Sequence, residues 1–483
     1  MNPWTALALA PYLLLLGLML AYSAHSLVLV VIHARAPKRG PAPESPDEPR
    51  VAVQLPVYNE ENVIARLLDA VAALDWPRDR LTIQLLDDSS DNTPALAAPL
   101  VARMQADGLD VQHLRRPERR GFKAGALAHG MAQTDAAFFA IFDADFVPPA
   151  DFLRRAMGHF ADARVAAVQG RWTHLNRAWS RLTRAQALAI DGHFAIEQEA
   201  RFAAGWFMNF NGSAGIWRRA AIDAAGGWSA DTLTEDLDLS YRAQLCGWRL
   251  VLDRDLTCPA ELPTTLAAFK AQQRRWATGS MQTARKLLPA IWRSPASLPS
   301  RVAATLHLTH YAVHPLSAAT AVLSVPCVLL PGMLAPPGPL WGVLLPFGLT
   351  VLGPTTLYLY ARRVLGLPLL PGVRDLGTLT LLGVGLTVSN ARAVLQAFQR
   401  RALAFDRTPK LGVVRAGDTV RRSYGVAADG LRSVELSLAC YCLCAAVGLL
   451  WTGVYAVAPF LLLDAAGLGF AAVSCWPRVG ETP

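Results

Sequence analysis

Two apolar regions, one at each end of the chain, constrain this sequence more than any other feature. The first runs from Ala6 to Ile32 and holds no Asp, Glu, Lys or Arg. It is longer than the roughly 20 residues that a helix needs to cross the hydrocarbon core of a bilayer. The alternative is a cleaved signal peptide, but such a peptide has a basic start and a shorter apolar stretch. No Lys or Arg precedes this run, so we expect a membrane anchor.

Later apolar runs predict further membrane spans. A shorter stretch, Leu376–Val388, is rich in Gly and Thr and lies between Arg374 and Arg392. We interpret this stretch as an interfacial or re-entrant segment rather than a span. The runs that we expect to span are Val302–Leu330, Leu340–Leu359, Leu436–Val457 and Pro459–Val473.

Basic residues next to these runs predict the orientation of the chain, because short cytoplasmic loops are enriched in Lys and Arg. Basic segments follow the first run, include Arg362-Arg363, and fill the last long loop from Arg400 to Arg432. The predicted topology has about five spans, with the amino terminus outside. We therefore predict an integral protein of the inner or plasma membrane. Its predicted parts are a transmembrane helix (1–34), a cytoplasmic domain (50–300), transmembrane helices (301–362), an interfacial helix with a cytoplasmic loop (363–434) and further transmembrane helices (435–476).

The formal net charge of +9 suits this arrangement, since basic cytoplasmic loops face anionic lipid in the bilayer and attract an anionic ligand. A nucleic-acid partner is the other common explanation of a basic chain. We expect no nucleic acid, because no basic run is interleaved with aromatic residues in the way that such binding requires.

The seven cysteines lack metal-binding spacing, so we interpret them as small apolar residues in a reducing compartment.

Between the apolar regions, short apolar runs alternate with helical patterns after a Pro-rich linker at Pro37–Pro49. Such alternation is typical of an α/β doubly wound, Rossmann-like sheet. Helices are predicted at Glu60–Leu74 and Thr93–Met104, and Asn92 or Thr93 would cap the second. The predicted strands, all parallel, are Val51–Leu55, Leu81–Leu86, Val111–Leu114 and Ala137–Phe142.

Polar and acidic side chains follow three of these strands at their carboxyl ends, where open α/β sheets bind ligands. Crowding several carboxylates at one edge is costly unless a cation and a polar ligand relieve the repulsion. Asp143 and Asp145 follow a strong apolar run, and the period of a strand would put both on one side. We predict that these two hold Mg²⁺ or Mn²⁺, although an isolated pair of this spacing is also common in turns and caps. The residues at the three strand ends are Tyr58, Asn59, Glu60, Asp87, Asp88, Asp143 and Asp145.

A second acidic motif, Thr234-Glu235-Asp236, precedes a helical pattern at Leu237–Leu245. Group transfer to a hydroxyl needs one general base to take the hydroxyl proton, and a positioned carboxylate contributes roughly 10²–10⁴-fold. We assign this role to Asp236. The alternative is a helix cap, since Thr and acidic residues suit a first turn. Both interpretations can hold together, because capping a helix at a site also fixes the base.

Two basic elements complete the candidate site. Lys123 lies in a Gly-containing element that opens a helix and could present amide groups to an anion, or only cap that helix. The motif Gln272-Gln-Arg-Arg275-Trp276 offers a flat indole for a sugar ring and a guanidinium for a phosphate. Its alternative is a basic interfacial helix in which Trp276 lies at the membrane surface.

These motifs occur in an order that resembles a known family. Asp87-Asp88, Asp143-Ala-Asp145, Thr234-Glu-Asp236 and Gln272-x-x-Arg275-Trp276 resemble the D, DxD, TED and QxxRW signature of processive family 2 glycosyltransferases, which include cellulose, chitin and hyaluronan synthases. Longer stretches are more similar to the plant cellulose-synthase-like mannan and glucomannan synthases, among them Pro56-Val-Tyr-Asn-Glu60, Gly121-Phe-Lys-Ala-Gly-Ala126 and Phe210-Asn-Gly-Ser-Ala-Gly215.

The resemblance implies a GT-A domain placed between transmembrane helices, a divalent metal, and a GDP-mannose or UDP-glucose donor. It also implies roles for residues of this chain. The nucleotide-sugar and metal would be bound by Tyr58, Glu60, Asp87, Asp88, Lys123, Asp143 and Asp145. Asp236, helped by Asp88, would be catalytic, and the acceptor end and diphosphate would contact Asn211, Glu235, Gln272, Arg275 and Trp276.

The resemblance extends to two further segments. The helix-like stretch Leu182–Ala203 leads to Asn209-Phe-Asn-Gly212 and resembles the element that touches the terminal sugar. Phe405–Lys410 resembles a gating loop that closes over bound donor, although Arg407 stands where cellulose synthases favour Val. Polar residues of the first later span are candidates to line a channel for the product, or simply pack between helices: His307, His310, Tyr311 and His314.

Three functions remain open from the sequence. The first is a hexosyltransferase that extends a β-linked polysaccharide and couples synthesis to export. The second is a non-processive glucosyltransferase with a ceramide- or diacylglycerol-type lipid acceptor, so that the acceptor is either a glycan or a glycolipid. The third is a transporter or scaffold with an inactive domain. The crowded carboxylates argue against the third, because an unused cluster would have no reason to tolerate its own repulsion.

Overall fold

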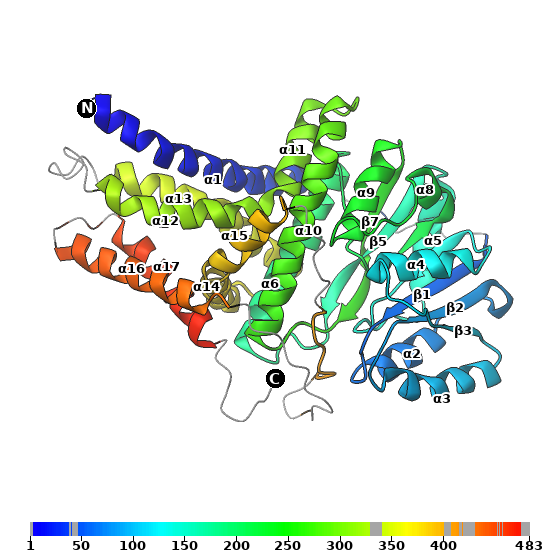
Figure 1. Cartoon of the computed structure of the whole chain (residues 1–483). Helices are drawn as coiled ribbons and strands as arrows, with labels where there is room; N and C mark the ends of the chain where they lie inside the picture. The colour runs from blue at the N-terminus through cyan, green and yellow to red at the C-terminus, as the bar shows by residue number, and fades with distance from the viewer. Residues whose placement is uncertain are drawn as a thin grey trace.

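The computed structural model describes residues 3–37, 40, 47–328, 341–399, 407–414, 418, 430–451, 453, 455 and 457–474. Figure 1 shows two parts, an α/β domain on the right and a group of long helices on the left. Helix α10 (Leu266–Arg293) stands between them, so it can place residues of one part against the other.

The described residues of the α/β domain contain one mixed sheet with the strand order β3-β2-β1-β4-β6-β5-β7. The four predicted strands are present and run parallel to one another, with Val51 paired to both Leu81 and Phe138. Strand β6 runs antiparallel to β4 and β5, which the sequence patterns did not predict. The strands are β1 (Val51–Val57), β2 (Leu81–Asp87), β3 (Asp110–Leu114), β4 (Phe138–Ile141), β5 (Val165–His174), β6 (Gly215–Arg218) and β7 (Arg249–Ala260).

Side-chain alternation along β1 divides the core into two layers. Val51 and Val53 point to a layer that includes α2 (Ile64–Ala72) and α3 (Thr93–Ala106). Ala52 belongs to the opposite layer, which α4 (Phe122–Ala132), α8 (Arg219–Ala224) and α9 (Glu235–Leu245) cover. Figure 1 shows these helices on the two sides of the sheet. The sheet is therefore buried on both faces, as its continuous apolar strands predict. Short elements complete the domain: η1 (Arg78–Arg80), α5 (Phe152–Met157) and η2 (Gly158–Ala161).

The predicted helical stretch Leu182–Ala203 is interrupted at its centre. Helix α6 (Arg181–Gly192) continues through the π-helical turn η3 (His193–Gln198) into α7 (Glu199–Ala203). This run packs against the long helices of the other part, since a Cβ at Gly192 would lie 2.6 Å from the ring of Tyr358.

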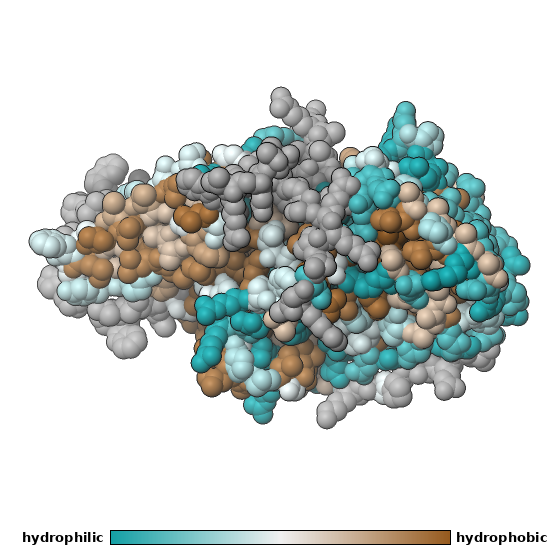
Figure 2. All heavy atoms as spheres, turned by 90° about the horizontal axis from the view of Figure 1, so that it is seen from below, coloured by the Kyte–Doolittle hydropathy of each residue, from teal (hydrophilic) through white to brown (hydrophobic). Residues whose placement is uncertain are grey.

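The other part consists of long apolar helices. They are α1 (Pro3–Arg35), α11 (Leu298–Leu308), η4 (His310–Ala312), α12 (Val313–Val328), α13 (Trp341–Val364), α14 (Leu369–Gly385), α15 (Thr387–Gln396), α16 (Arg432–Trp451) and α17 (Ala458–Ser474). Figure 2 shows hydrophobic side chains gathered over this part on the left, while hydrophilic ones predominate over the α/β domain. Exposed apolar side chains on these helices include Leu14, Val31, Val351, Val447 and Val473.

Two helices among the described residues are long and apolar enough to cross a bilayer, Ala10–Arg35 and Arg432–Trp451. They correspond to the first and fourth predicted spans. Helices α14 and α15 pass the same test only as a pair bent by 49°, so Leu376–Val388 contains a bend, as a broken span or a re-entrant segment would. The predicted run Val302–Leu330 is not one helix, because α11 ends at Leu308 and α12 begins at Val313. Leu329, Leu330 and Leu340 lie outside the described residues.

Specific contacts join the two parts. At the end of α1, His33 lies 2.9 Å from the Glu199 carboxylate and 3.1 Å from the Tyr360 hydroxyl. Lys270 of α10 and Glu435 of α16 form a buried ion pair of 2.5 Å. The first set of contacts joins α1 to α7 and α13, and the ion pair joins α10 to α16.

Candidate active site

A single pocket at the carboxyl ends of the strands gathers nearly all of the predicted site residues. Its lining comes from strand ends, from the starts of α4 and α9, from α10 and from the segment after residue 406. The predicted residues that line it are Tyr58, Glu60, Asp88, Lys123, Asp143, Asp145, Asn211, Glu235, Asp236, Gln272, Arg275 and Trp276. Segments more than 200 residues apart thus meet because parallel strands end at the same sheet edge.

Asp87 is the predicted site residue that does not line this pocket. Its carboxylate is buried at the end of β2, where it accepts a hydrogen bond from the Ser89 amide at 2.9 Å and lies 2.9 Å from His113 Nε2. Successive side chains of a strand point to opposite faces, so only Asp88 turns into the pocket. Asp88 is paired there with Arg116. The Asp87 side chain therefore connects the end of β2 to Ser89 and His113.

Glu60 and Tyr58 follow β1 and are both held by arginines. Arg407 donates two hydrogen bonds to the Glu60 carboxylate, at 3.0 and 3.1 Å. Burial raises the pKa of Glu60, and the Arg407 charge opposes that rise. The guanidinium carbon of Arg119 lies 3.4 Å from the centroid of the Tyr58 ring. A planar cation stacked on an aromatic face is a surface on which a nucleobase can also stack.

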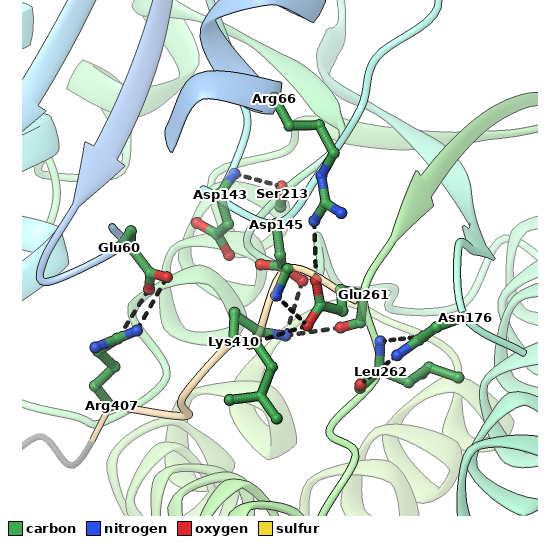
Figure 3. A network of polar contacts seen from close by, with 12 residues as sticks. Glu60, Arg66, Asp143, Asp145, Asn176, Ser213, Glu261, Leu262, Arg407 and Lys410 are labelled. Carbon is green, nitrogen blue, oxygen red and sulfur yellow. Dashed lines mark hydrogen bonds and ion pairs between the residues drawn. The ribbon is translucent and has the colours of Figure 1, made fainter. Parts of the chain in front are cut away.

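Asp143 and Asp145 sit on a turn after β4, which ends at Ile141 and therefore earlier than predicted. Both nevertheless face the pocket, and each is held by a lysine. Lys123 Nζ lies 2.5 Å from Asp143 Oδ1, and Lys410 Nζ lies 2.8 Å from Asp145 Oδ2. Figure 3 shows Asp145 and Lys410 at the centre of this network. Although burial disfavours its charged form, Asp143 and Glu235 raise the pKa of Lys123, which therefore stays protonated.

These two carboxylates have the chemistry that a divalent cation requires. They offer oxygen ligands only, as Mg²⁺ and Mn²⁺ prefer. The described residues contain no group of three or more His, Cys, Asp or Glu side chains suited to a metal ion. A cation here would therefore take its other ligands from water or from a bound anion such as a diphosphate.

Asp236 and Glu235 lie in the first turn of α9 and face the same pocket. Burial, and then the neighbouring Glu235 charge, raise the pKa of Asp236 to about 7. A carboxylate with such a pKa is suited to accept a proton near neutral pH. Thr234 occupies the N-cap position of α9, but its side chain makes no capping hydrogen bond.

Gly212 lets the main chain pass close to the Asp236 carboxylate. Its φ is +83°, and a Cβ at this position would lie 2.9 Å from Asp236 Oδ2. The Gly212 carbonyl also accepts a hydrogen bond of 2.7 Å from Lys123. Any side chain here would strain the backbone and push against the Asp236 carboxylate.

Helix α10 carries Gln272, Arg275 and Trp276 to the other wall of the pocket. Burial lowers the pKa of Arg275, while Glu235 and Asp143 oppose that change. Trp276 also packs on a cluster that includes Tyr311 and Ala393. The predicted motif therefore belongs to the pocket and at the same time contacts the long helices.

The segment 407–414 lies across the pocket, as Figure 3 shows for Arg407 and Lys410. Glu261 holds it: one carboxylate oxygen accepts hydrogen bonds from the amides of Leu411 and Gly412, at 2.9 and 3.1 Å. Arg66 pairs with the other oxygen at 3.0 Å. Phe405 and Asp406 of the predicted gating loop lie outside the described residues.

Sequence reasoning missed several pocket residues. Arg119 follows β3 and Glu261 follows β7, so each lies at a strand end like the residues that were predicted. Arg116 also follows β3 and pairs with Asp88 without lining the pocket itself. The position of Arg116 and Arg119 after a predicted strand could have signalled them. Glu261 could not be found in this way, because β7 was not predicted.

The polar residues proposed to line a channel are bonded within the protein. His307 Nδ1 lies 2.7 Å from the Tyr241 hydroxyl, and His314 Nε2 lies 3.0 Å from the Asn390 amide. Tyr311 donates a hydrogen bond of 3.2 Å to Gln273. These contacts support packing between helices, and they leave the role in a channel as a prediction.

The pocket thus joins a carboxylate whose pKa is raised to about 7, the cations Lys123 and Arg275, and the pair Asp143 and Asp145 at the edge of an α/β sheet. Residues 49–279 match the family model described as "Glycosyltransferase like family 2", and this part of the chain is a glycosyltransferase family 2 domain.

The curated relatives carry more specific names than this family model. The chain is 38% identical over 313 residues to glucomannan 4-beta-mannosyltransferase 2 of Arabidopsis thaliana, covering 63% of this chain and 58% of the relative. It is 41% identical over 253 residues to glucomannan 4-beta-mannosyltransferase 1 of Oryza sativa subsp. japonica, covering 51% of this chain and 48% of the relative. The chain thus spans about half the length of the curated relatives that it matches.

Among solved structures, the fold is similar to that of the mannosyltransferase PcManGT from Pyrobaculum calidifontis, in complex with GDP-Man and Mn²⁺. The TM-score is 0.52 at 22% sequence identity, over 80% of this chain and all of the other. This likeness shows a GT-A-like fold with a mixed sheet.

Proposed function

We propose that this protein is a membrane-bound, inverting hexosyltransferase that transfers mannose from GDP-mannose to a growing β-linked polysaccharide. The observation that carries the proposal is the convergence of Asp236, whose pKa is raised to about 7, with Lys123 and Arg275 in one pocket. That set provides a base for an acceptor hydroxyl and cations for a leaving diphosphate. The names of the curated relatives support mannose over glucose.

The reaction is an in-line displacement at the anomeric carbon. Asp236 takes the proton of the acceptor hydroxyl while its oxygen forms a bond to that carbon. The bond from the same carbon to the diphosphate breaks on the opposite face, so the configuration inverts. Arg275 and Lys123 stabilise the negative charge that develops on the departing diphosphate.

Asp143 and Asp145 are the residues that would hold a divalent cation. When bound, such a cation neutralises charge on the nucleoside diphosphate. The PcManGT structure contains Mn²⁺ and GDP-Man, which supports the same two ligands here without deciding between Mg²⁺ and Mn²⁺. The stacked Tyr58 and Arg119 are the proposed platform for the nucleobase, with Asp88 and Arg116 at its edge.

Several predictions from sequence remain part of this proposal. We propose the boundaries 1–34, 50–300, 301–362, 363–434 and 435–476. The α/β domain (50–300) lies in the cytoplasm, 363–434 forms an interfacial helix and a cytoplasmic loop, and the other three segments are transmembrane helices. Trp276 and Gln272 would contact the acceptor end of the glycan. The exposed apolar side chains of the long helices support a position in the bilayer.

The decisive experiment uses the purified full-length chain with radiolabelled GDP-mannose and, separately, UDP-glucose. We expect polymer from GDP-mannose in the presence of Mn²⁺ or Mg²⁺, and no polymer after EDTA. A single lipid-soluble sugar adduct would instead identify the lipid-acceptor transferase. Transfer that persists at full rate in Asp236→Asn would remove Asp236 from the mechanism, and an absence of transfer from either donor would contradict the proposal.

A further inference from the structure

The turn η3 (His193–Gln198) stands out because it is the π-helical break in the run from α6 to α7. In an α-helix, residue i+5 points about 140° away from residue i. A π-helical turn has i→i+5 hydrogen bonds and so brings residue i+5 back toward the face of residue i. Such turns are frequent at functional sites. Here the turn allows His193, Glu197 and Gln198 to belong to one hydrogen-bonded network.

That network ends at Asn211, which lines the pocket next to Gly212 and Asp236. Gln198 Nε2 lies 2.6 Å from the Asn209 carbonyl oxygen and 3.0 Å from Asn211 Oδ1. Asn211 Nδ2 lies 3.0 Å from His193 Nε2, and His193 Nδ1 lies 3.0 Å from Glu197 Oε2.

The direction of every bond in this chain follows from one backbone carbonyl. The Asn209 carbonyl can only accept, so Gln198 must present its NH₂ group. The second N–H of that group then donates to Asn211, which must present its oxygen. Asn211 therefore turns its own NH₂ group toward His193. His193 Nε2 must accept this bond, which requires the proton of the ring to be on Nδ1.

Glu197 completes the chain because it accepts that Nδ1 proton. Although burial disfavours the charged form, His193 and Arg201 hold the pKa of Glu197 well below its ordinary value, so the carboxylate is ionised. An ionised carboxylate is the partner that fixes a neutral histidine in one tautomer. The Asn211 main-chain amide is fixed as well, by a 2.7 Å bond to Gln169.

After these bonds, Asn211 keeps one N–H and one lone pair of Oδ1 for a ligand. We propose that His193, Glu197 and Gln198 are positioning residues that orient the Asn211 amide, so that its remaining N–H binds a hydroxyl of the acceptor sugar beside Asp236. This inference rests on the proposed transferase function. It concerns acceptor affinity rather than the chemical step, because neither His193 nor Glu197 is among the residues that line the pocket.

The test compares single and double variants of the full-length protein with GDP-mannose and a short β-1,4-linked mannose oligomer. Losing a hydrogen bond of this kind lowers affinity by about tenfold. We expect His193→Leu to raise the oligomer KM by about that factor, with kcat and the GDP-mannose dissociation constant unchanged. His193→Gln, which keeps an acceptor, should retain most of the affinity. Asn211→Ala should lose the same amount, and the double variant His193→Leu/Asn211→Ala should lose no more.

A matched control is available in His159, which lies 3.1 Å from the Asp253 carboxylate outside the pocket. His159→Leu also removes a histidine–carboxylate pair but should leave the oligomer KM unchanged. Additive losses in the double variant, or an equal loss of GDP-mannose affinity, would overturn the inference.

Direct binding separates this inference from the proposed function. Oligomer binding is followed by tryptophan fluorescence, since Trp276 and Trp172 line the pocket. If transfer fails in the wild type but His193→Leu still weakens oligomer binding, the proposed function fails and the inference stands. A wild-type protein that binds no oligomer would overturn the inference itself.

Discussion

Lys410 and Asp145 are 265 residues apart in sequence, yet the lysine ammonium donates a hydrogen bond of 2.8 Å to the aspartate carboxylate inside the pocket. Lys410 also donates to the Glu261 carbonyl at 2.8 Å. The Lys410 ammonium is therefore bonded to a carboxylate that is one of the two proposed ligands of a divalent metal. Under the proposed function, docking of the segment and binding of a metal would compete for Asp145 Oδ2.

Lys410→Met should therefore tighten metal binding. Removing the competing charge leaves Asp145 free for Mn²⁺, and we expect the Mn²⁺ dissociation constant to fall by about threefold to tenfold. Calorimetric titration of the ligand-free protein measures it. Lys286→Met is the matched control, because Lys286 pairs at 2.8 Å with both Asp231 and Asp238, neither of which lines the pocket. Equal Mn²⁺ affinity in Lys410→Met and wild type would exclude the competition.

The pH dependence of transfer should report Asp236. Its pKa is raised to about 7, and a base acts only when deprotonated. We expect kcat/KM to rise tenfold per pH unit below about pH 7 and to level off above it. Because the folded protein holds this proton more tightly than the unfolded chain, Asp236 also costs stability as the pH rises through its folded pKa.

The profile is measured from about pH 5 to pH 9 with saturating metal. In Asp236→Asn, transfer should fall by roughly 10²–10⁴-fold. Asp231→Asn, which changes an exposed carboxylate of the same region, should keep the wild-type profile. A flat wild-type profile across pH 7 would be incompatible with Asp236 as the base.

Alanine substitutions at two glycines with positive φ, Gly212 and Gly205, distinguish the effect of backbone strain from the effect of displacing the Asp236 carboxylate. Gly212→Ala places a Cβ against the Asp236 carboxylate, whereas the space around Gly205, with φ +64°, is open. Both substitutions should cost about 1–2 kcal/mol of stability because both force alanine into a left-handed conformation. Only Gly212→Ala should also lower kcat, by as much as about 100-fold through displacement of the base. Equal activity losses in the two variants would show that strain alone is responsible.

The buried Lys270–Glu435 pair predicts a large stability effect. Glu435→Gln removes the Glu435 charge that lies 2.5 Å from the buried Lys270 ammonium, and we expect a loss of about 3–5 kcal/mol. The double variant Lys270→Met/Glu435→Met should recover most of that loss, since it removes both charges. Denaturant unfolding in detergent measures these differences. The exposed pair Arg103–Asp69 is the control, and breaking it should cost about 1 kcal/mol or less.

The strand-end motifs were predictable because local chemistry and a simple rule of topology placed them together. Asp88, Asp143 and Lys123 each follow or precede a recognisable apolar element, and the ends of parallel strands meet at one edge. The choice between Asp87 and Asp88 needed the register of β2, which the sequence pattern does not resolve. The four parallel strands β1 to β4 were found, whereas β5, β6 and β7 were not, and β6 with its four residues is too short for its pattern to be recognised.

The resemblance to a gating loop predicted that the segment Phe405–Lys410 approaches the donor site, but the individual contacts of this segment were beyond sequence reasoning. Nothing near Arg407 in the chain points to Glu60, and nothing near Lys410 points to Asp145, because these pairs form only when the long helices fold back onto the domain. The π-helical turn at His193–Gln198 was likewise read as regular helix, since one extra residue in a turn leaves the apolar spacing almost unchanged.

Residues after 406 line the pocket, so the α/β domain alone does not contain all of the pocket residues. The recognisable family domain stops at residue 279, inside α10, which continues to Arg293. An excised fragment with that boundary would lose Arg407 and Lys410, the partners of Glu60 and Asp145, and would expose Lys270 without Glu435. The pocket is therefore built from more of the chain than the segment that matches the family model, because Arg407, Thr408 and Lys410 also line it.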